Sequence, residues 1–242
     1  MISGKSNDIE LLAPAGNFES LMAAIQGGAD AVYFGVGKLN MRAGSSKNFS
    51  VSDLEEIRRI SDQHGVRAYV TLNTVMYNED LEYAREIIDA VLKHRIDAIV
   101  ASDFSIINYA RSVGVKVHIS TQANVSNIES LKFFAGFADV IVLARELSLE
   151  QVSDLCRQVD EQNITGPEGD KVRIEAFAHG ALCMAISGKC YLSLHEKNKS
   201  ANRGECNQLC RRGYTVTENE EGYQLDIDNE YIMSPKDLST IS

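Results

Sequence analysis

Residues 10–36, with the sequence ELLAPAGNFESLMAAIQGGADAVYFGV, contain one complete strand–helix–strand unit. The apolar runs at 10–15 and 31–36 have the length and the side chains of buried strands. The residues between them have the apolar spacing of a helix, and Gly27 and Gly28 stand where that helix should end. Because two parallel strands need such a crossover, this unit predicts an α/β fold built on a parallel sheet.

The same alternation continues along the rest of the chain. Helical periodicity is clearest at 78–95 and 148–163. In addition to the two strands above, the candidate strands are 67–73, 98–102, 116–122, 139–144, 172–180 and 231–235. Eight strands joined by seven crossovers predict a TIM-type (β/α)8 barrel, a fold of about 250 residues whose catalytic groups lie at the carboxyl ends of the strands.

The last candidate strand is followed by only a short stretch. Residues 236–242 are too few for a closing helix, which needs roughly ten residues. We therefore expect one barrel domain over residues 1–242 with its last helix truncated, as in a fragment of a longer protein.

Charge and hydropathy narrow the possible partners. The net charge of −10 argues against a protein that coats nucleic acid with its whole surface, although residues 195–214 form a basic patch with five basic side chains against two acidic ones. No apolar run approaches the roughly 20 residues of a membrane span, and the polar start MISGKSNDIE does not resemble a signal segment. We expect a soluble, cytoplasmic protein that makes no membrane contact.

Four of the five cysteines cluster in one loop-rich stretch. Cys183, Cys190, Cys206 and Cys210 follow the spacing C-x6-C-x15-C-x3-C, and residues 183–212 are called the cysteine segment below. This segment takes the place of the crossover helix between the seventh and eighth strands, so it should lie over the barrel mouth. Several thiolates that converge from loops suit zinc or an iron–sulfur cluster, and the spacing alone does not choose the metal.

The alternative use of these cysteines is a disulfide framework. Such a framework needs an oxidising compartment, which the start of the chain does not indicate. The fifth cysteine, Cys156, stands beside Leu155 and three residues before Val159 in a helical pattern. We expect Cys156 to be a small buried core residue.

Polar side chains near the predicted strand ends are candidates for catalysis. His118 and Gln122 share one face of a predicted strand, and inside a barrel that face is the lumen. Glu175 and His179 share a face of another strand, where they form either an acid–base pair or a buried structural hydrogen bond. Arg145 follows the sixth strand, and its planar fork of donors suits a carboxylate or a phosphate.

Five further residues are candidates for substrate binding. Asn73 follows the third strand, and Arg42 lies in a polar loop after the second, where it is either functional or simply solvated. Arg203, Arg211 and Arg212 belong to the basic patch, which suits the phosphates of a nucleic acid.

With these residues assembled, the chain resembles the collagenase-like peptidase family U32. The matching stretches are LLAPAGNFESLMAAIQGGADAVYFG (11–35), STQANV (120–125), HGALCMAISGKCYLS (179–193), NRGECNQLCRRGY (202–214) and SPKDL (234–238). The likeness covers essentially the whole chain, and the cysteine span is the signature of the family.

The resemblance implies a function that differs from the family name. Members are linked to 5-hydroxylation of the tRNA wobble uridine with prephenate, to hydroxylation of a cytidine in large-subunit ribosomal RNA, and to anaerobic ubiquinone hydroxylation. By this resemblance, the chain should support oxygen-independent hydroxylation of an RNA pyrimidine. Its implied cofactor is an iron–sulfur cluster of the 4Fe-4S type, its partner is tRNA or ribosomal RNA, and prephenate is a possible anionic co-substrate.

The resemblance also assigns the cluster ligands. Cys183, Cys190 and Cys206 match three ligands of the family. The fourth usually follows SPKDL, where this chain has Ser239. The set is complete only if Cys210 takes that place; the alternatives are a cluster that is labile or absent and, less favoured, weak ligation by the Ser239 hydroxyl.

Two other functions stay open at this point. The family name supports a peptidase, although the sequence has neither a GxSxG elbow nor an HExxH helix to offer such a mechanism. A non-catalytic scaffold stapled by zinc or a cluster is the third possibility.

Overall fold

Seven parallel strands form the framework of the protein in the computed structural model, which describes residues 9–44, 47–227 and 237–239. The strands are β1 (Leu12–Pro14), β2 (Ala31–Gly35), β3 (Arg67–Leu72), β4 (Ala98–Ala101), β5 (Val117–Ile119), β6 (Val140–Val142) and β7 (Arg173–Glu175). Their order in the sheet is their order in the chain. The repeated strand–helix unit therefore builds an α/β fold, as the sequence predicts.

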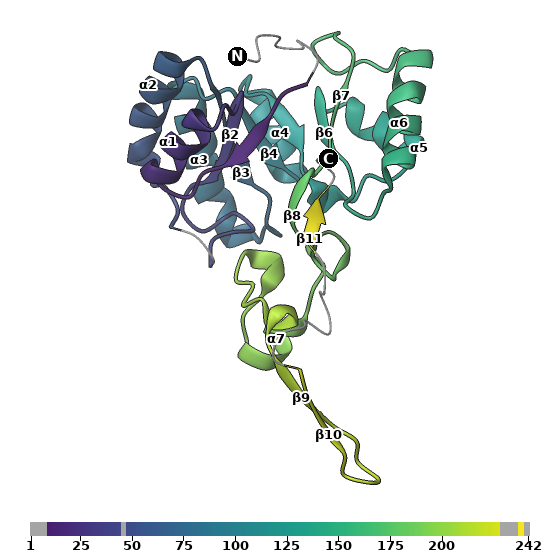
Figure 1. Cartoon of the computed structure of the whole chain (residues 1–242). Coiled ribbons are helices and arrows are strands. Elements are labelled where there is room, and N and C mark those ends of the chain that lie inside the picture. The colour runs from purple at the N-terminus through teal and green to yellow at the C-terminus, as the bar shows by residue number, and fades with distance from the viewer. Residues whose placement is uncertain (1–8, 45–46, 228–236, 240–242) are drawn as a thin grey trace.

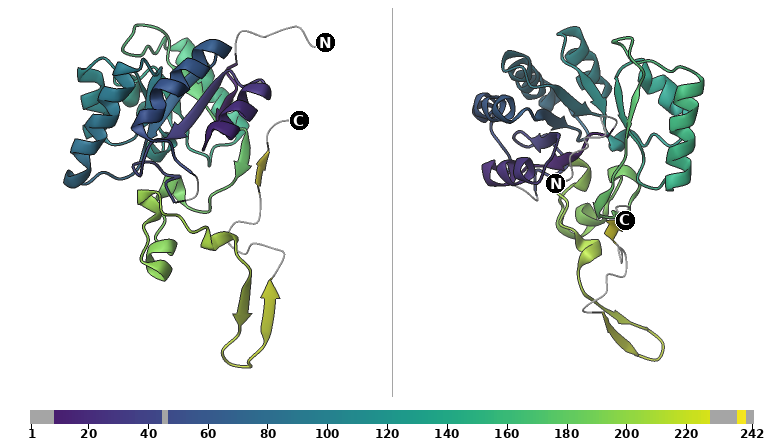
Figure 2. Two further views of the ribbon diagram at one scale, coloured as in Figure 1. Left: turned by 90° about the vertical axis from the view of Figure 1, so that its left-hand side faces the viewer. Right: turned by 45° about the horizontal axis from the view of Figure 1, so that its top comes forward.

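Six helices pack on the outer face of the curled sheet (Figures 1 and 2). They are α1 (Phe18–Gln26), α2 (Leu54–His64), α3 (Leu81–Lys93), α4 (Phe104–Ser112), α5 (Ile128–Ala135) and α6 (Leu149–Glu161). Each strand sends alternate side chains to this face, and Phe34, Val70 and Ile99 belong to the large buried cluster found there. The opposite face lines a lumen with a much smaller buried cluster, which includes Ala31, Tyr69 and others.

Glu10 ties three strands together at the amino end of the lumen. Its carboxylate lies 2.5 Å from Arg67 of β3 and 3.1 Å from Arg173 of β7, and it accepts a hydrogen bond of 2.7 Å from Tyr69. Because Glu10 precedes β1, these contacts bring the two edge strands of the sheet toward each other. The sheet is therefore curled to the extent that the residue two positions before its first strand pairs with its last strand. The seven described strands with their helices form this curled, barrel-like sheet, which is called the barrel below.

Several polar residues at the strand ends are helix caps. The side chains of Asn17, Asp103, Asn127 and Ser148 each accept a hydrogen bond from a backbone N–H in the first turn of the following helix. A helix leaves its first N–H groups without partners, and such side chains satisfy them. A polar residue after a barrel strand therefore has a structural use that does not depend on catalysis.

Two predicted strands differ from the structure. The candidate strand at 231–235 lies outside the described residues. The predicted strand at 172–180 is divided, because the chain leaves the sheet after Glu175 and residues 176–178 are exposed. The second part becomes β8 (His179–Ala181), which pairs antiparallel with β11 (Asp237–Ser239) apart from the main sheet.

The cysteine segment contains only short elements. They are the 3-10 turns η4 (Ile186–Gly188), η5 (Ala201–Arg203) and η6 (Leu209–Arg211) and the helix α7 (Leu192–Lys197). A hairpin of β9 (Tyr214–Thr217) and β10 (Gln224–Ile227) follows and projects away from the barrel (Figures 1 and 2). Among the helices of the described residues, none is long and apolar enough to cross a membrane.

Candidate functional site

The cysteine segment lies across the carboxyl ends of the strands (Figure 1). It bonds to the loops that follow β2, β3 and β5. The three contacts are Gly44 N to Gly204 O at 2.8 Å, Val75 N to Asn202 O at 3.0 Å, and Ser187 Oγ to Asn124 Oδ1 at 2.8 Å. Because these loops all follow carboxyl ends, the segment covers the end of the barrel where catalytic groups usually lie.

Gly204 allows the segment to approach the barrel at backbone distance. Its φ of +86° is in the left-handed region, and a Cβ at this position would lie 2.2 Å from the carbonyl oxygen of Asn40. Any other residue would collide with backbone that has no room to move. Gly204 therefore fixes where the segment, including Cys206 two residues later, rests on the loop after β2.

Arg203 forms the main ionic contact between the segment and the barrel. Its guanidinium donates two hydrogen bonds to the carboxylate of Asp80, at 2.5 and 3.1 Å, and a third to the carbonyl of Val75 at 3.0 Å. Asp80 is almost fully buried, and the hydrogen bond from Arg203 lowers the pKa of its carboxyl. Arg203 therefore has a structural role that the sequence does not predict, with three of its five N–H donors engaged within the chain. Its contact with a substrate stays a prediction.

The four clustered cysteines are all free and partly buried. The pKa of the Cys210 thiol is raised, chiefly by burial and further by the neighbouring sulfurs of Cys183, Cys206 and Cys190. Such an influence between thiols acts only over short distances in a hydrated protein. Four soft donors that form no disulfide are thus gathered in one part of the segment, and the Cys206 sulfur accepts a hydrogen bond of 3.4 Å from the backbone N–H of Gln208. Such a donor set suits an iron–sulfur cluster or zinc.

The sulfurs do not form a ready-made site for a single ion. Within the described residues, no three His, Cys, Asp or Glu side chains meet as ligands of one metal ion do. Ser239, at the position where the resemblance predicts a fourth ligand, is exposed on β11 and pairs with His179 of β8. Position 239 thus lies beside the strand that leads into the cysteine segment, but it offers a hydroxyl in place of a thiol.

Glu175 is a carboxyl group of the lumen with a strongly raised pKa. Burial raises its pKa to about 7, with a further contribution from Glu10, while Arg173 acts in the opposite direction. The pKa of Tyr33, another buried lumen group, is also raised, first by burial and in part by Glu175. A carboxyl group that titrates near neutral pH can both donate and accept a proton under physiological conditions.

Two arginines approach the lumen from the carboxyl ends. Arg42 places its guanidinium 5.6 Å from the ring centroid of Tyr33, and Arg145 lies 6.0 Å from that of Phe177. The Nε atom of Arg145 is buried and has no hydrogen-bond partner among the described residues. A buried donor without an acceptor is costly, so the surroundings of Arg145 suit an anionic or carbonyl-bearing ligand.

His118 belongs to the floor of the lumen. Only 5% of it is exposed, and its ring packs edge-on against Tyr69 with a centroid distance of 4.5 Å. Burial lowers its pKa to about 3, and the cations Arg173, Arg67 and Lys116 add to this effect. The imidazole therefore stays neutral at physiological pH. Because these cations come from the amino ends of the strands, its position suits core packing better than catalysis at the mouth.

Asn73 links two parts of the mouth. Its side-chain oxygen accepts a hydrogen bond of 3.1 Å from Met41 N, and its amide nitrogen donates one of 3.1 Å to Ser120 Oγ. Gln122 does not share a strand face with His118, because β5 ends at Ile119 and Gln122 lies in the 3-10 turn η3 (Thr121–Ala123). Strand periodicity therefore does not place Gln122 in the lumen. The two hydrogen bonds of Asn73 hold the loops after β2 and β5 in position.

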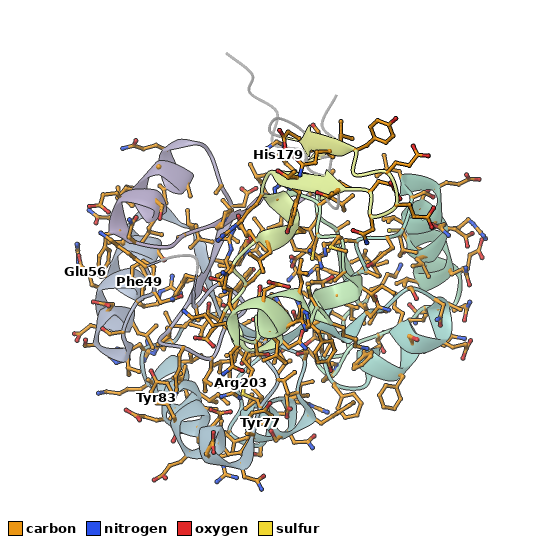
Figure 3. All side chains as sticks on the ribbon, turned by 90° about the horizontal axis from the view of Figure 1, so that it is seen from below. Phe49, Glu56, Tyr77, Tyr83, His179 and Arg203 are labelled. Atoms are coloured by element: carbon orange, nitrogen blue, oxygen red, sulfur yellow. The ribbon has the colours of Figure 1, made fainter. Side chains whose placement is uncertain are left out.

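His179 and Glu175 do not form the predicted pair on one strand. His179 is exposed, and it begins β8 while Glu175 ends β7. Figure 3 shows His179 on the opposite side of the mouth from Arg203. The prediction failed because the chain leaves the sheet between the two residues, so their spacing of four has no strand geometry.

Arg211 and Arg212 lie where the cysteine segment leads into the hairpin. Arg211 belongs to η6, and exposed Arg212 donates a hydrogen bond of 3.3 Å to the carbonyl of Asn207.

The prediction that Cys156 is a buried core residue is wrong. It lies on α6, but its side chain is exposed, so the core is filled by its neighbours Leu155 and Val159 instead.

Two hollows lie beside the cysteine segment, at a place that sequence patterns do not indicate. The first has a volume of about 310 Å³, and the second, about 500 Å³, shares Lys38 with it. The first is lined by Lys38, Leu39, Ala43, Gly44, Thr74, Arg203 and Glu205, and the second by Gly37, Lys38, Glu79, Asp80 and Tyr83. They bring together loops that are distant in sequence, which is why no local motif reveals them.

Comparison with known proteins gives consistent results. The family model of peptidase family U32 matches residues 16–242. A collagenase of Porphyromonas gingivalis is 59% identical over 235 residues, covering 97% of this chain and 57% of the relative. The tRNA hydroxylation protein P1 of Bacillus subtilis is 35% identical, covering 96% of this chain and 54% of the relative.

Two further similarities extend this picture. A 23S rRNA 5-hydroxycytidine synthase of Escherichia coli is 35% identical, covering 96% of this chain and 33% of the relative. A solved structure of a U32 peptidase shares the fold, with a TM-score of 0.56 at 16% identity, covering 74% of this chain and 72% of the other. The chain spans about half the length of the first two relatives and a third of the synthase.

Proposed function

The chain belongs to peptidase family U32, and from that premise we propose that it supports hydroxylation of an RNA pyrimidine. The relatives at 35% identity that are named for RNA hydroxylation match nearly its full length. The observation that carries the proposal is the gathering of four free thiols over a barrel mouth that contains a carboxyl group with a pKa of about 7.

We assign an iron–sulfur cluster of the 4Fe-4S type to Cys183, Cys190, Cys206 and Cys210. Four thiolates are the common ligand set of such a cluster, and zinc is the alternative occupant of the same donors. When bound, the cluster supplies electron transfer or an iron site to the reaction. Cys210 takes the place of the fourth ligand in this assignment. The sulfurs of the other three cysteines contribute to the raised pKa of its thiol, whereas position 239 carries a hydroxyl.

The other residues of the mouth would bind the substrate and exchange a proton with it. Arg145 would hold an anion, either a carboxylate of a co-substrate such as prephenate or a phosphate of the RNA, because its buried Nε lacks a partner among the described residues. Glu175 would exchange a proton with the reacting molecule at its carboxyl oxygen near pH 7. The RNA backbone would be met by the exposed basic side chains Lys197 and Arg212, and by Arg211 beside them.

A peptidase is the second candidate, because the relative at 59% identity is named a collagenase. A thiol peptidase needs a cysteine with a histidine and an orienting group in reach. His179 is exposed on β8, and His118 is buried on the lumen floor, where burial lowers its pKa to about 3 and makes it a weak base. The histidines at the barrel therefore support this mechanism less well than the thiol cluster supports the first.

The test is anaerobic purification followed by iron and sulfide analysis and absorption spectroscopy. The expected result is a bound cluster that Cys183→Ser removes and that the matched control Cys156→Ser retains. In cells, deletion of the gene should leave specific pyrimidines of tRNA or ribosomal RNA lighter by one oxygen atom, and Cys183→Ser should reproduce that loss. Cleavage of gelatin by metal-free protein, together with unchanged RNA masses in the deletion strain, would support the peptidase instead.

A further inference from the structure

Tyr77 is an exposed aromatic residue that contacts both members of the Arg203–Asp80 ion pair. It lies in the loop between β3 and η2 (Asn78–Asp80), and 53% of it is exposed. The Arg203 guanidinium lies 4.2 Å from the centroid of its ring, the closest such contact described in the chain. One face of the ring is therefore covered by a cation, and the exposed fraction must come from the edge and the other face.

Asp80 fixes both partners of this stack. Its carboxylate accepts the two hydrogen bonds from Arg203 and a third, of 2.9 Å, from the backbone N–H of Tyr77. Asp80 is 2% exposed and Arg203 is 21% exposed at their side chains, so neither moves freely in solvent. The ring and the guanidinium are thus oriented before any ligand arrives, which lowers the entropy cost of stacking a further planar group.

The surroundings of the stack leave space for a ligand. The hollow of about 310 Å³ is lined by Arg203, and the hollow of about 500 Å³ by Asp80, so each adjoins one partner of Tyr77. Figure 3 shows Tyr77 beside Arg203 at one rim of the mouth, with Tyr83 close by. Lys38 lines both hollows and is exposed, and no ion pair of Lys38 occurs in the described part of the chain.

We propose that Tyr77, backed by Arg203, is a stacking platform for a nucleobase of single-stranded RNA. This inference rests on the proposed function for the class of its substrate, and it adds the position where a base is held. Bases stack on aromatic rings and on guanidinium planes in sequence-specific and nonspecific RNA recognition. Arg203 stands three residues before Cys206 in the sequence, so the platform is joined to the cysteine segment through one of its partners.

The charges around the platform predict how RNA binding through Tyr77 should depend on salt. Glu79 and Glu205 line the two hollows together with Lys38, so the local charge does not favour a polyanion. Stacking depends little on salt, whereas contacts between basic side chains and phosphates weaken steeply as salt rises. The contribution of Tyr77 to RNA binding should therefore persist at a salt concentration that abolishes the contribution of the basic patch.

The experiment measures binding of a fluorescein-labelled single-stranded RNA oligonucleotide of mixed sequence by anisotropy, at low and at high salt. Tyr77→Ala should weaken binding about tenfold at both salt concentrations, and Tyr77→Phe should stay within about twofold of the unmodified protein. Tyr223→Ala, which removes an equally large ring that is 71% exposed on the hairpin, is the matched control and should bind normally. Thermal unfolding of each variant shows that the fold is kept.

Three outcomes overturn the platform: equal binding by Tyr77→Ala, equal loss in Tyr77→Phe, or no binding of the oligonucleotide by the unmodified protein. The proposed function is judged separately, by the masses of RNA pyrimidines in the deletion strain. If those masses fall by one oxygen atom while Tyr77→Ala binds RNA normally, hydroxylation stands and the platform fails. If the masses are unchanged while Tyr77→Ala loses binding, the platform stands and the hydroxylation proposal fails.

Discussion

The barrel and the cysteine segment are stabilised in different ways. The barrel buries a continuous apolar cluster between its strands and helices, from Ala15 to Val172. After residue 175, the buried apolar side chains in the described part of the chain are Ala201 and Leu209. The segment is instead attached to loops of the barrel by hydrogen bonds and, among the described residues, by the ion pair between Arg203 and Asp80. The comparison indicates that the barrel is ordered by apolar burial, whereas the order of the cysteine segment depends on its polar contacts with the barrel.

The largest expected effect comes from removing apolar contacts in the barrel, compared with a matched removal in the cysteine segment. Ile88 of α3 is fully buried, so Ile88→Ala should lower the free energy of unfolding of the barrel by about 4 kcal/mol. Leu209→Ala removes a buried side chain of similar size from the cysteine segment, and it should leave the main denaturation midpoint nearly unchanged. Urea denaturation followed by circular dichroism measures both. Equal losses would show that the two regions unfold as one unit.

The next effect concerns the ion pair that joins the two regions. Arg203→Met leaves the buried carboxylate of Asp80 without its cation, and docking of the segment should weaken by about 3 kcal/mol. Hydrogen exchange should then become faster over residues 183–212 and remain slow in β2 to β5. Arg212→Met is the control, because Arg212 is exposed and makes a single hydrogen bond to the Asn207 carbonyl. Unchanged exchange in Arg203→Met would show that other contacts suffice for docking.

The smallest effect is a dependence on pH inside the barrel. The pKa of Glu175 is about 7 in the folded chain, against 4.5 for an ordinary glutamate, so the folded state keeps a proton that the unfolded state releases. Stability should therefore be complete below about pH 4.5 and decline as the pH rises through 7. Glu175→Gln stays neutral and should be more stable than the unmodified protein by roughly 2 kcal/mol at pH 8, with no gain at pH 4. Thermal unfolding over this pH range measures the difference, and a constant difference would contradict the raised pKa.

The fold could be predicted further than the site, for a physical reason. Burial in the barrel repeats along the chain, so runs such as 31–36 and 98–102 predict β2 and β4 directly. The division of 172–180 into two strands could not be predicted in this way. It depends on where the chain leaves the sheet to cross the mouth, and no local pattern of Glu175 to His179 records that change of direction.

The candidate site shows the same limit. The cysteines could be found from their clustering, because a ligand set near one centre is partly local in sequence. Tyr77, Asp80 and Arg203 could not, since the first two come from the loop after β3 and the third from a segment more than a hundred residues later. Arg203 was therefore predicted to meet a phosphate, when its partner is a carboxylate of its own chain.

The bonds between Arg203 and the loop after β3 also have a consequence for the order of assembly. They join residues that are 128 and 123 positions apart, so they form late, after the sheet that presents Val75 and Asp80 is in place. During synthesis the strands β1 to β7 leave the ribosome before the cysteine segment. Until the cysteine segment docks, its four free thiols are more exposed to solvent than in the folded chain, so the interval between folding of the barrel and docking is when they are most open to oxidation.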